Sequence, residues 1–345
     1  MATITIDGQP LEFEGQTKVL QLILDSGEEL PHFCYHPALS IPANCRQCLV
    51  RAGTPAMDPA TRQPKLKDDG TPEIAFMPKL QTACSLDAAD GMVIETRRTS
   101  PLVHEAQETN LEFLLINHPL DCPICDQAGQ CPLQIQAYKY GPEGSRFEFR
   151  KVHKPKRVQL GPRVVLDAER CINCTRCTRF TSEISKSEQL TIIARGVNNY
   201  PLTPPGVVFD EPYSLNVVDI CPVGALTAAD SRFKARAWEM AETPSITVVN
   251  AKGSNCFYKV RDNIVVGVSP RANAAVNAYW LADEDREVAR FNDDRASGSQ
   301  VRDGGTLRAA SWEEAYDRAA EVLRTAEGPI LFMGSAHASV EDNYL

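Results

Sequence analysis

The chain has 345 residues, 43% of them hydrophobic, and a formal net charge of −9. A chain of this size is expected to form two or three globular domains with cores of their own. The negative charge argues against nucleic acid as the main partner, because phosphate binding requires a basic face. No apolar run approaches the ~20 residues that cross a bilayer, and the first residues lack the pattern of a secretory signal. We therefore expect a protein of the reducing cytosol that has no membrane span.

The first segment is expected to contain strands at residues 3–6, 11–13 and 92–96 and a helix at 19–26. Three cysteines in one loop and a distant fourth, within such a small mixed sheet, are typical of a β-grasp ferredoxin-like domain. Their plant-type spacing predicts a [2Fe-2S] cluster. The predicted ligands are Cys34, Cys45, Cys48 and Cys84. Residues 55–78 are rich in Pro, Asp, Lys and Gly and predict an inserted surface loop.

Three polar residues lie beside these ligands. Arg46, between two of them, is expected either to offset the negative charge of the thiolates or simply to be solvated. His32 and His36 flank Cys34, and we interpret both as ordinary loop residues because four thiolates already complete the site.

The second group of ligands follows a predicted helix that begins after Ser100 with Pro101 and ends at His118. A further helix is expected at residues 133–140. The group supplies only three thiolates, so a histidine is predicted to complete a [4Fe-4S] site, as imidazole does in some iron–sulfur proteins. The predicted ligands are His118, Cys122, Cys125 and Cys131. A neutral imidazole removes one negative charge, which should favour the reduced cluster and couple protonation to redox.

The third group has the spacing of a bacterial ferredoxin, with a strand expected at 163–166 before it and a helix after it. Its predicted ligands are Cys171, Cys174, Cys177 and Cys221. Thr181 stands where a second Cys-Pro would serve another cluster, so one [4Fe-4S] cluster is predicted. Zinc is the alternative, but zinc sites favour two separated Cys-x2-Cys pairs, and close sets in a reducing compartment argue against disulfides. The remaining cysteine, Cys256, is expected to pack as a small hydrophobic residue.

Two further regions carry weaker signals. Residues 150–157 are basic and are interpreted as a solvated linker, with a docking surface for an acidic partner as the alternative. Beyond Thr243 the pattern predicts a strand at 246–249, a hairpin around Asp262-Asn263, a helix capped by Ser311, and a buried strand at 329–333.

Neither a Gly-x-Gly-x-x-Gly turn nor a pairing of nucleophile and base stands out in the sequence. We expect no catalytic residue on this chain. The chemistry that remains is one-electron transfer among buried clusters, whose potentials the protein sets by ligand type, hydrogen bonds and burial.

In this order, the three ligand sets resemble those of the large iron–sulfur subunit of bacterial complex I, the G-type subunit of NADH-quinone oxidoreductase. Four segments carry the resemblance, namely residues 45–50 (Cys-Arg-Gln-Cys-Leu-Val), 117–123 (Asn-His-Pro-Leu-Asp-Cys-Pro), 219–225 (Asp-Ile-Cys-Pro-Val-Gly-Ala) and 236–240 (Arg-Ala-Trp-Glu-Met). The resemblance implies an α+β multidomain chain. The implied domains are a β-grasp [2Fe-2S] domain (1–98), a helical His/Cys3 cluster domain (99–140), a [4Fe-4S] ferredoxin-like domain (141–242), a β-rich domain (243–300) and the start of a molybdopterin-oxidoreductase-like α/β domain (301–345).

The resemblance also implies an electron route. Electrons from NADH would enter at the flavin of a neighbouring subunit, pass through one [2Fe-2S] and two [4Fe-4S] clusters, and leave through a downstream ferredoxin-type subunit toward quinone. The chain itself would hold no NADH or quinone site. It would be a peripheral subunit on the cytoplasmic side of a membrane complex that pumps protons.

Two departures from the family pattern matter. Some family members hold a further [4Fe-4S] cluster whose ligands correspond here to Thr247, Asn250, Ser254 and Ala282. The β-rich domain is therefore expected to lack a cluster. Family members also continue well beyond residue 345. Two other functions are considered: a diaphorase subunit of an NAD-linked hydrogenase, and a truncated, non-functional fragment that binds clusters.

Overall fold

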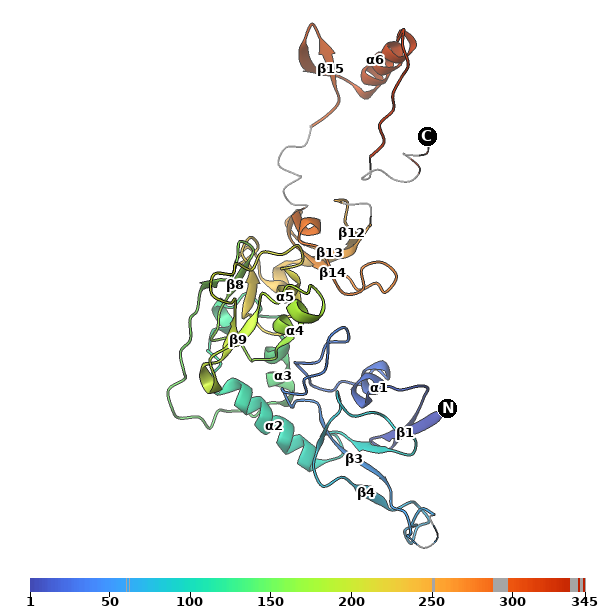
Figure 1. Ribbon diagram of the computed structural model, residues 1–345, viewed down its shortest axis with the longest axis vertical. Helices are drawn as coiled ribbons and strands as arrows, with labels where there is room; N and C mark the ends of the chain where they lie inside the picture. Colours follow the sequence, from blue (N-terminus) through green and yellow to red (C-terminus); the bar gives the residue numbers. More distant parts are fainter. Residues whose placement is uncertain are drawn as a thin grey trace. The chain divides into compact units, whose positions relative to one another are not determined.

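The computed structural model describes residues 1–59, 61, 63–249, 252–287, 297–335, 341 and 344. The chain forms two compact units, Met1–Met240 and Ala241–Leu345 (Figure 1). Among the described residues, no helix combines the length and the apolar character that crossing a bilayer requires.

A mixed sheet with the order β2-β1-β6-β3-β4 forms the N-terminal part of the first unit. Its elements are β1 (Ala2–Ile6), β2 (Gln9–Phe13), α1 (Val19–Asp25), β3 (Leu49–Pro55), β4 (Ile74–Phe76), β5 (Gln81–Thr82) and β6 (Val93–Glu95). The central pair β1 and β6 is parallel and the neighbouring pairs are antiparallel, which is the β-grasp arrangement predicted from the sequence. Ile4, Leu20 and Ile94, all fully buried, place strands and helix around one core.

The insertion at residues 55–78 lies at the surface, as its composition predicts, and it also contains β-structure. Its end forms β4, which pairs with β3 and becomes the outermost strand on that side of the sheet, and isolated bridges join Met57 to Pro64 and Leu66 to Pro72. Gly53 allows this close pairing, because a Cβ there would lie 2.7 Å from Cγ2 of Ile74. The side of β3 that faces away from β6 therefore provides backbone partners that composition alone does not reveal.

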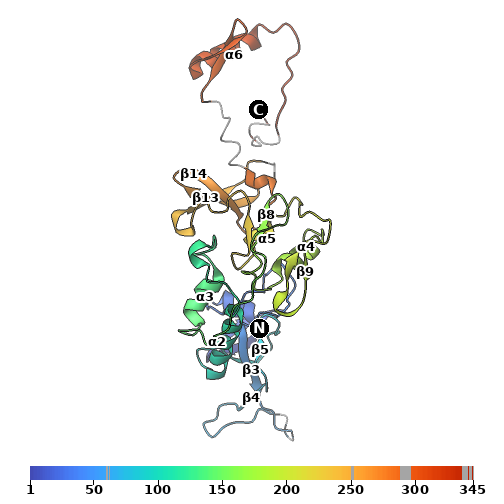
Figure 2. The same cartoon turned by 90° about the vertical axis from the view of Figure 1, so that its left-hand side faces the viewer.

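Helix α2 (Pro101–Leu115) follows the sheet and is succeeded by the 3-10 turn η1 (Cys122–Ile124) and helix α3 (Pro132–Tyr140). Both predicted helices are confirmed, and Pro101 stands in the first turn of α2 as expected. Ser100, by contrast, makes no side-chain capping hydrogen bond. Figures 1 and 2 both show α2 running along the N-terminal sheet beside β3.

The rest of the first unit is a small three-stranded sheet, β11-β8-β7, with a two-stranded ladder of β9 and β10 beside it in the chain. Its elements are β7 (Val158–Gln159), β8 (Val164–Leu166), α4 (Arg176–Glu183), β9 (Thr191–Ile193), η2 (Gly196–Asn198), β10 (Tyr200–Leu202), α5 (Asn216–Asp219), β11 (Leu226–Ala228) and η3 (Ala237–Glu239). The strand expected at 163–166 is confirmed as β8. The helix expected after Cys177 begins slightly earlier, at Arg176.

The basic stretch 150–157 lies outside helices and strands and is largely exposed, as expected of a solvated linker, but two of its lysines are anchored to neighbouring segments. Lys151 Nζ donates to the carbonyls of Leu115 and Ile116 at 2.9 and 2.7 Å, where a cation complements the helix C-terminus. Lys156 pairs with Asp121 and Glu169, each at 2.6 Å. These contacts bind the stretch back onto the segments that carry the second and third ligand groups.

The second unit contains an antiparallel meander, a hairpin and a helix. These are β12 (Ala241–Ile246), β13 (Asn255–Arg261), β14 (Ile264–Pro270), β15 (Gln300–Asp303), β16 (Thr306–Ala309) and α6 (Trp312–Arg324). The hairpin around Asp262-Asn263 and the Ser311 cap, which accepts from the Glu314 amide at 3.1 Å, are confirmed. The predicted strand at 246–249 is wrong, because pairing with β13 places β12 earlier. The buried strand at 329–333 is also wrong, since that segment is exposed and not in a strand.

Candidate metal centres

The four cysteines of the first set come together at the edge of the β-grasp sheet. All are buried, with Cys84 at 0% and Cys45 at 8% exposure. The Cys34 thiol interacts with those of Cys45 and Cys84, and Cys84 interacts with Cys48. The amide of Phe33 donates to Sγ of Cys45 at 3.4 Å. The structure therefore brings together the set predicted from the sequence.

The electrostatics of the first set favour a bound cation. Hydrogen bonds from Cys45 and then Cys84 lower the pKa of the Cys34 thiol to about 2, and the bond with Cys34 in turn raises the pKa of Cys45. The thiolate forms of Cys34 and Cys48 are thus stabilised, whereas the pKa values of Cys45 and Cys84 are raised. Four buried thiolates require a cation to be stable together, so this donor set fits an iron centre.

Helix α2 holds the loop that carries Cys45 and Cys48. Nε2 of Gln107, which is fully buried, donates to the Leu49 carbonyl at 2.9 Å. Nδ2 of Asn110, one turn further along, donates to the Arg46 carbonyl at 3.0 Å. Because the same helix ends just before His118, it connects the first ligand set to the second.

The second set is only partly assembled around its predicted ligands. Cys125 and Cys131 are buried, whereas Cys122 is exposed. The three thiols act on one another electrostatically, since burial raises the pKa of Cys131 and the charges of Cys125 and Cys122 raise it further. Within the described residues, no hydrogen bond joins the His118 ring to these thiols.

The ring of His118 has the features of a metal ligand. Its Nδ1 is buried and has no hydrogen-bond partner among the described residues. Burial, and then the charges of Arg170 and Lys151, lower the pKa of His118 to about 4. The ring is therefore neutral at physiological pH, which is the form that binds a metal.

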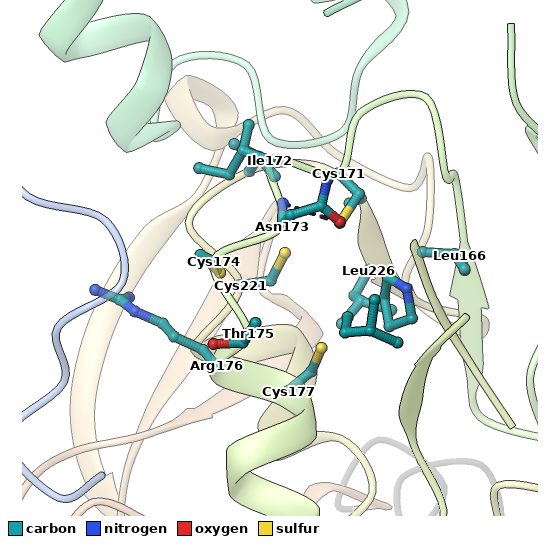
Figure 3. A pocket seen from close by; sticks show the side chains of 14 residues that line it. Leu166, Cys171, Ile172, Asn173, Cys174, Thr175, Arg176, Cys177, Cys221 and Leu226 are labelled. Carbon is teal, nitrogen blue, oxygen red and sulfur yellow. Dashed lines mark hydrogen bonds between the residues drawn. The ribbon is translucent and has the colours of Figure 1, made fainter. Parts of the chain in front are cut away.

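The third set lines a single pocket in the ferredoxin-like part of the unit. Figure 3 shows the sulfur atoms of Cys171, Cys177 and Cys221 facing one space, with Leu226 across from them. Cys174 also lines this pocket. Burial raises the pKa of Cys171 to about 12 and that of Cys174 to about 11. As in the first set, an iron–sulfur cluster would supply the positive charge that four enclosed thiolates need.

Local backbone geometry shapes this third loop. Asn173 and Thr175 take left-handed conformations, with φ of 53° and 59°. These two residues alternate with the cysteines, and the backbone N–H of Asn173 donates to Sγ of Cys171 at 3.4 Å. Hydrogen bonds from backbone amides to sulfur are among the factors that set the reduction potential of a cluster.

No three His, Cys, Asp or Glu side chains within the described ranges converge on one point where a single metal ion would bind. In a cubane each ligand attaches to a different iron atom. In a [2Fe-2S] cluster each iron takes two protein ligands, so neither kind of cluster needs three side chains at one point.

Arg46 is exposed, which agrees with the solvated alternative for this residue. The cations that approach the first and third sets are instead Arg176 and Arg179 of α4. The sequence places them beside Cys177, but their reach toward Cys34 depends on contacts between residues more than a hundred positions apart. Cys256 is buried at 0% exposure, as expected.

A β-grasp sheet, followed by a helical segment and a ferredoxin-like segment that each carry grouped thiols, defines a multidomain iron–sulfur protein. Family models agree in the same order. They are a 2Fe-2S iron-sulfur cluster binding domain (1–99), the NADH-ubiquinone oxidoreductase-G iron-sulfur binding region (107–146), the NADH-quinone oxidoreductase subunit 3 ferredoxin-like domain (161–227) and the NADH-ubiquinone oxidoreductase NDSU1/NuoG-like 4Fe-4S domain (240–290). The chain belongs to the family of large iron–sulfur subunits of NADH-quinone oxidoreductase, whose members are named the G subunit or subunit 3.

Similarity to curated relatives covers the whole chain. It is 39% identical to the G subunit of NADH-quinone oxidoreductase from Rickettsia bellii over 100% of this chain and 47% of the relative. It is 38% identical to subunit 3 of the Thermus thermophilus enzyme over 100% of this chain and 46% of that protein. The NADH-ubiquinone oxidoreductase 75 kDa subunit of Reclinomonas americana is 38% identical over 92% of this chain and 42% of its own length. The chain thus spans about half the length of the curated relatives it matches.

A solved structure shares part of the fold. The crystal structure of an NAD+-reducing [NiFe]-hydrogenase in its H2-reduced state matches with a TM-score of 0.54 and 28% identity. The match covers 68% of this chain and 90% of that chain. Part of the fold is therefore shared with a chain of an NAD+-reducing hydrogenase.

Proposed function

We propose that this chain transfers electrons as the iron–sulfur segment of an NADH-quinone oxidoreductase. The observation that carries the proposal is that three grouped sets of thiols lie within one compact unit, Met1–Met240, and that every one of these thiols except Cys122 is buried or half-buried. Family membership supports the same function. Sets of four thiol or imidazole ligands are suited to holding clusters that move electrons.

The proposed cofactors are one [2Fe-2S] cluster and two [4Fe-4S] clusters. The first would be held by Cys34, Cys45, Cys48 and Cys84. The second would be held by His118, Cys122, Cys125 and Cys131, and the third by Cys171, Cys174, Cys177 and Cys221. The buried Nδ1 of His118 supports its role in the second site. When bound, the clusters supply one-electron carriers, while the protein supplies enclosure and charge.

The proposed domain boundaries follow the sequence prediction, at residues 98/99, 140/141, 242/243 and 300/301. Residues 243–300 are proposed to fold without a cluster, although the matched family model names a 4Fe-4S domain. In support, Cys256 is the single cysteine of that region. Of the positions that correspond to ligands, Thr247 and Ser254 are buried and Asn250 lies outside the described residues. Residues 301–345 are proposed to begin a molybdopterin-oxidoreductase-like domain.

Partners and location follow from the proposed function. Electrons would come from a flavin subunit that oxidises NADH and leave to a ferredoxin-type subunit on the quinone side. The assembled complex would lie at the cytoplasmic side of the cell membrane and translocate protons. The chain itself would bind neither NADH nor quinone.

Iron and acid-labile sulfide analysis of anaerobically purified protein tests the proposal. The expected content is about ten iron and ten sulfide per chain, with one [2Fe-2S] and two [4Fe-4S] signals in low-temperature EPR during stepwise reduction. About four further irons would show that residues 243–300 do hold a cluster. Bound zinc without labile sulfide would overturn the assignment of all three sites.

The hydrogenase structure favours a second candidate, the diaphorase iron–sulfur subunit of an NAD-linked hydrogenase. Purification of the native complex decides between the two. A flavin subunit with NADH-to-quinone electron transfer supports the first function, whereas H2-dependent NAD+ reduction supports the second. Clusters without any flavin partner would indicate a fragment that is not functional.

A further inference from the structure

Two arginines of helix α4 lie between the first and the third ligand sets. Nη1 of Arg176 donates to the carbonyl of Ile220, the residue before Cys221, at 3.1 Å. Its Nη2 donates to the carbonyl of Tyr35, the residue after Cys34. Figure 3 shows this side chain extending away from the sulfur atoms of the third set, toward the blue N-terminal segment.

Arg179 makes the same connection through the ligand residues themselves. Its Nη2 donates to the carbonyl of Cys34 at 2.6 Å and to that of Cys174 at 3.3 Å. Its Nη1 donates to the carbonyl of Ser40, and its Nε donates to Oγ1 of Thr175 at 3.2 Å. A single nitrogen atom thus contacts one predicted ligand of each set.

Neither arginine is held by a direct ion pair in the part of the chain that the structure describes. All the acceptors named above are neutral. Glu183, on the same helix, accepts from the amide of Ser40 at 2.8 Å and from its hydroxyl. Burial raises the pKa of Glu183, but hydrogen bonds from Ser40 and then the charge of Arg179 lower it, so this carboxylate lies near Arg179 without bonding to it. Arg179 is only 9% exposed, and the buried Nε of Arg176 has no partner among the residues described.

A buried cation without a direct ion pair is unfavourable, so further negative charge should lie nearby. The carbonyls that Arg176 contacts belong to the chain neighbours of Cys34 and Cys221, and two of those that Arg179 contacts belong to Cys34 and Cys174 themselves. These cysteines belong to both sets. Thiolate-ligated clusters in the two sites would provide negative charge on either side of the arginines.

We propose that Arg176 and Arg179 form a shared cationic bridge that raises the reduction potentials of both the [2Fe-2S] and the third-set [4Fe-4S] cluster and fixes the separation of the two sites. This inference rests on the proposed function. A cation stabilises the electron-rich, reduced state of any cluster close to it, and here the same charge lies close to two. Both residues are positioning residues, since they act through backbone carbonyls and charge rather than by binding iron.

The test uses the full chain with Arg176→Gln, Arg179→Gln and the corresponding lysine variants, purified anaerobically and titrated under EPR detection. Each glutamine variant should lower the reduction potentials of both clusters by about 59 mV, which corresponds to a tenfold change in the equilibrium constant of a one-electron couple. Lysine variants should keep potentials close to those of the parent. The second-set cluster serves as an internal reference, and Arg324→Gln, which removes an exposed charge of α6, serves as the matched control.

The outcomes are distinct. A shift confined to one cluster, or lysine variants that behave like the glutamine variants, would refute a shared charge. Unshifted potentials in glutamine variants that retain both clusters would refute the bridge and leave the proposed function intact. Loss of iron from glutamine but not lysine variants would support the bridge. A parent chain without iron and labile sulfide would overturn the function itself.

Discussion

Gly224 lies directly against the sulfur of Cys125, so that a Cβ at Gly224 would overlap Sγ of Cys125 and lie 3.2 Å from Cβ of Gln127. Gly224 belongs to the loop of Cys221, a predicted ligand of the third set. Nearby, Sγ of Cys131 lies 3.7 Å from the carbonyl of Pro222. The second and third sites therefore share one wall.

Gly224→Ala should damage the second site although it lies in the loop of the third. The added methyl group must displace Cys125, at a cost typical of overpacking, about 1–3 kcal/mol. We expect loss or distortion of the EPR signal of the second-set cluster, with the third-set signal retained. Gly144→Ala is the control, because nothing lies within 4 Å of a Cβ there. Equal effects of the two substitutions would contradict the shared wall.

His118→Cys should retain a [4Fe-4S] cluster in the second site with a lower reduction potential. A thiolate adds the negative charge that a neutral imidazole lacks, which disfavours the reduced state. A decrease of about 59 mV in the reduction potential, which is a tenfold change in the equilibrium constant of a one-electron couple, is large enough to measure. His104→Cys, on the exposed side of α2, should leave the titration curve unchanged. An unaltered potential in the His118 variant would exclude this residue from the site.

Asp7→Asn should weaken the β-grasp sheet in a pH-dependent manner. Burial would raise the pKa of Asp7, but hydrogen bonds from Thr96, Thr99 and Arg98 together lower it below 3.8. Its folded-state pKa is depressed, so its contribution is complete above the usual pKa and is lost as pH falls through the lowered one.

Thermal unfolding of the parent and Asp7→Asn proteins tests this. The charged hydrogen bonds should make the variant less stable by about 2 kcal/mol near neutral pH. The difference should narrow below about pH 4. Asp68→Asn, at an exposed position, should match the parent throughout. A difference that persists unchanged into acid would assign the effect to packing.

Gln107→Leu should loosen the first site without removing a ligand. The substitution leaves the buried Leu49 carbonyl unpaired, which costs about 1–3 kcal/mol. The loop between Cys45 and Leu49 should then open more often, and a chelator should remove the [2Fe-2S] absorbance faster. Glu105→Leu, on the exposed face of the same helix, is the comparison. Identical rates of bleaching would show that α2 does not hold the loop.

Local signals account for what the sequence predicts well. The first turn of α2 follows from Pro101, the cap of α6 from Ser311, and the β13–β14 turn from Asp262-Asn263. Each of these depends on a few adjacent residues. The closely spaced cysteines of each set are also a local signal, whereas the distant members Cys84 and Cys221 are predicted from the ferredoxin-type pattern as a whole.

Non-local pairing explains the errors. Strand β12 begins at Ala241 because its backbone pairs with β13, and the apolar run that follows it gives no hint of this register. The insertion contains β4 because its backbone pairs with β3. Similarly, Arg46 is adjacent to two ligands yet exposed, whereas Arg179 reaches Cys34 from far along the chain.

Because α2 holds the loop that carries Cys45, the β-grasp segment should not be separated from this helix without loss of stability. A transplant of the β-grasp segment that stopped near Arg98 would remove the side chain that satisfies the Leu49 carbonyl, and with it the buried contacts of Val103 and Leu111. The smallest segment of this chain that could hold the first cluster by itself is therefore expected to extend through α2. Recombination between related proteins should tolerate a junction after that helix better than one before it.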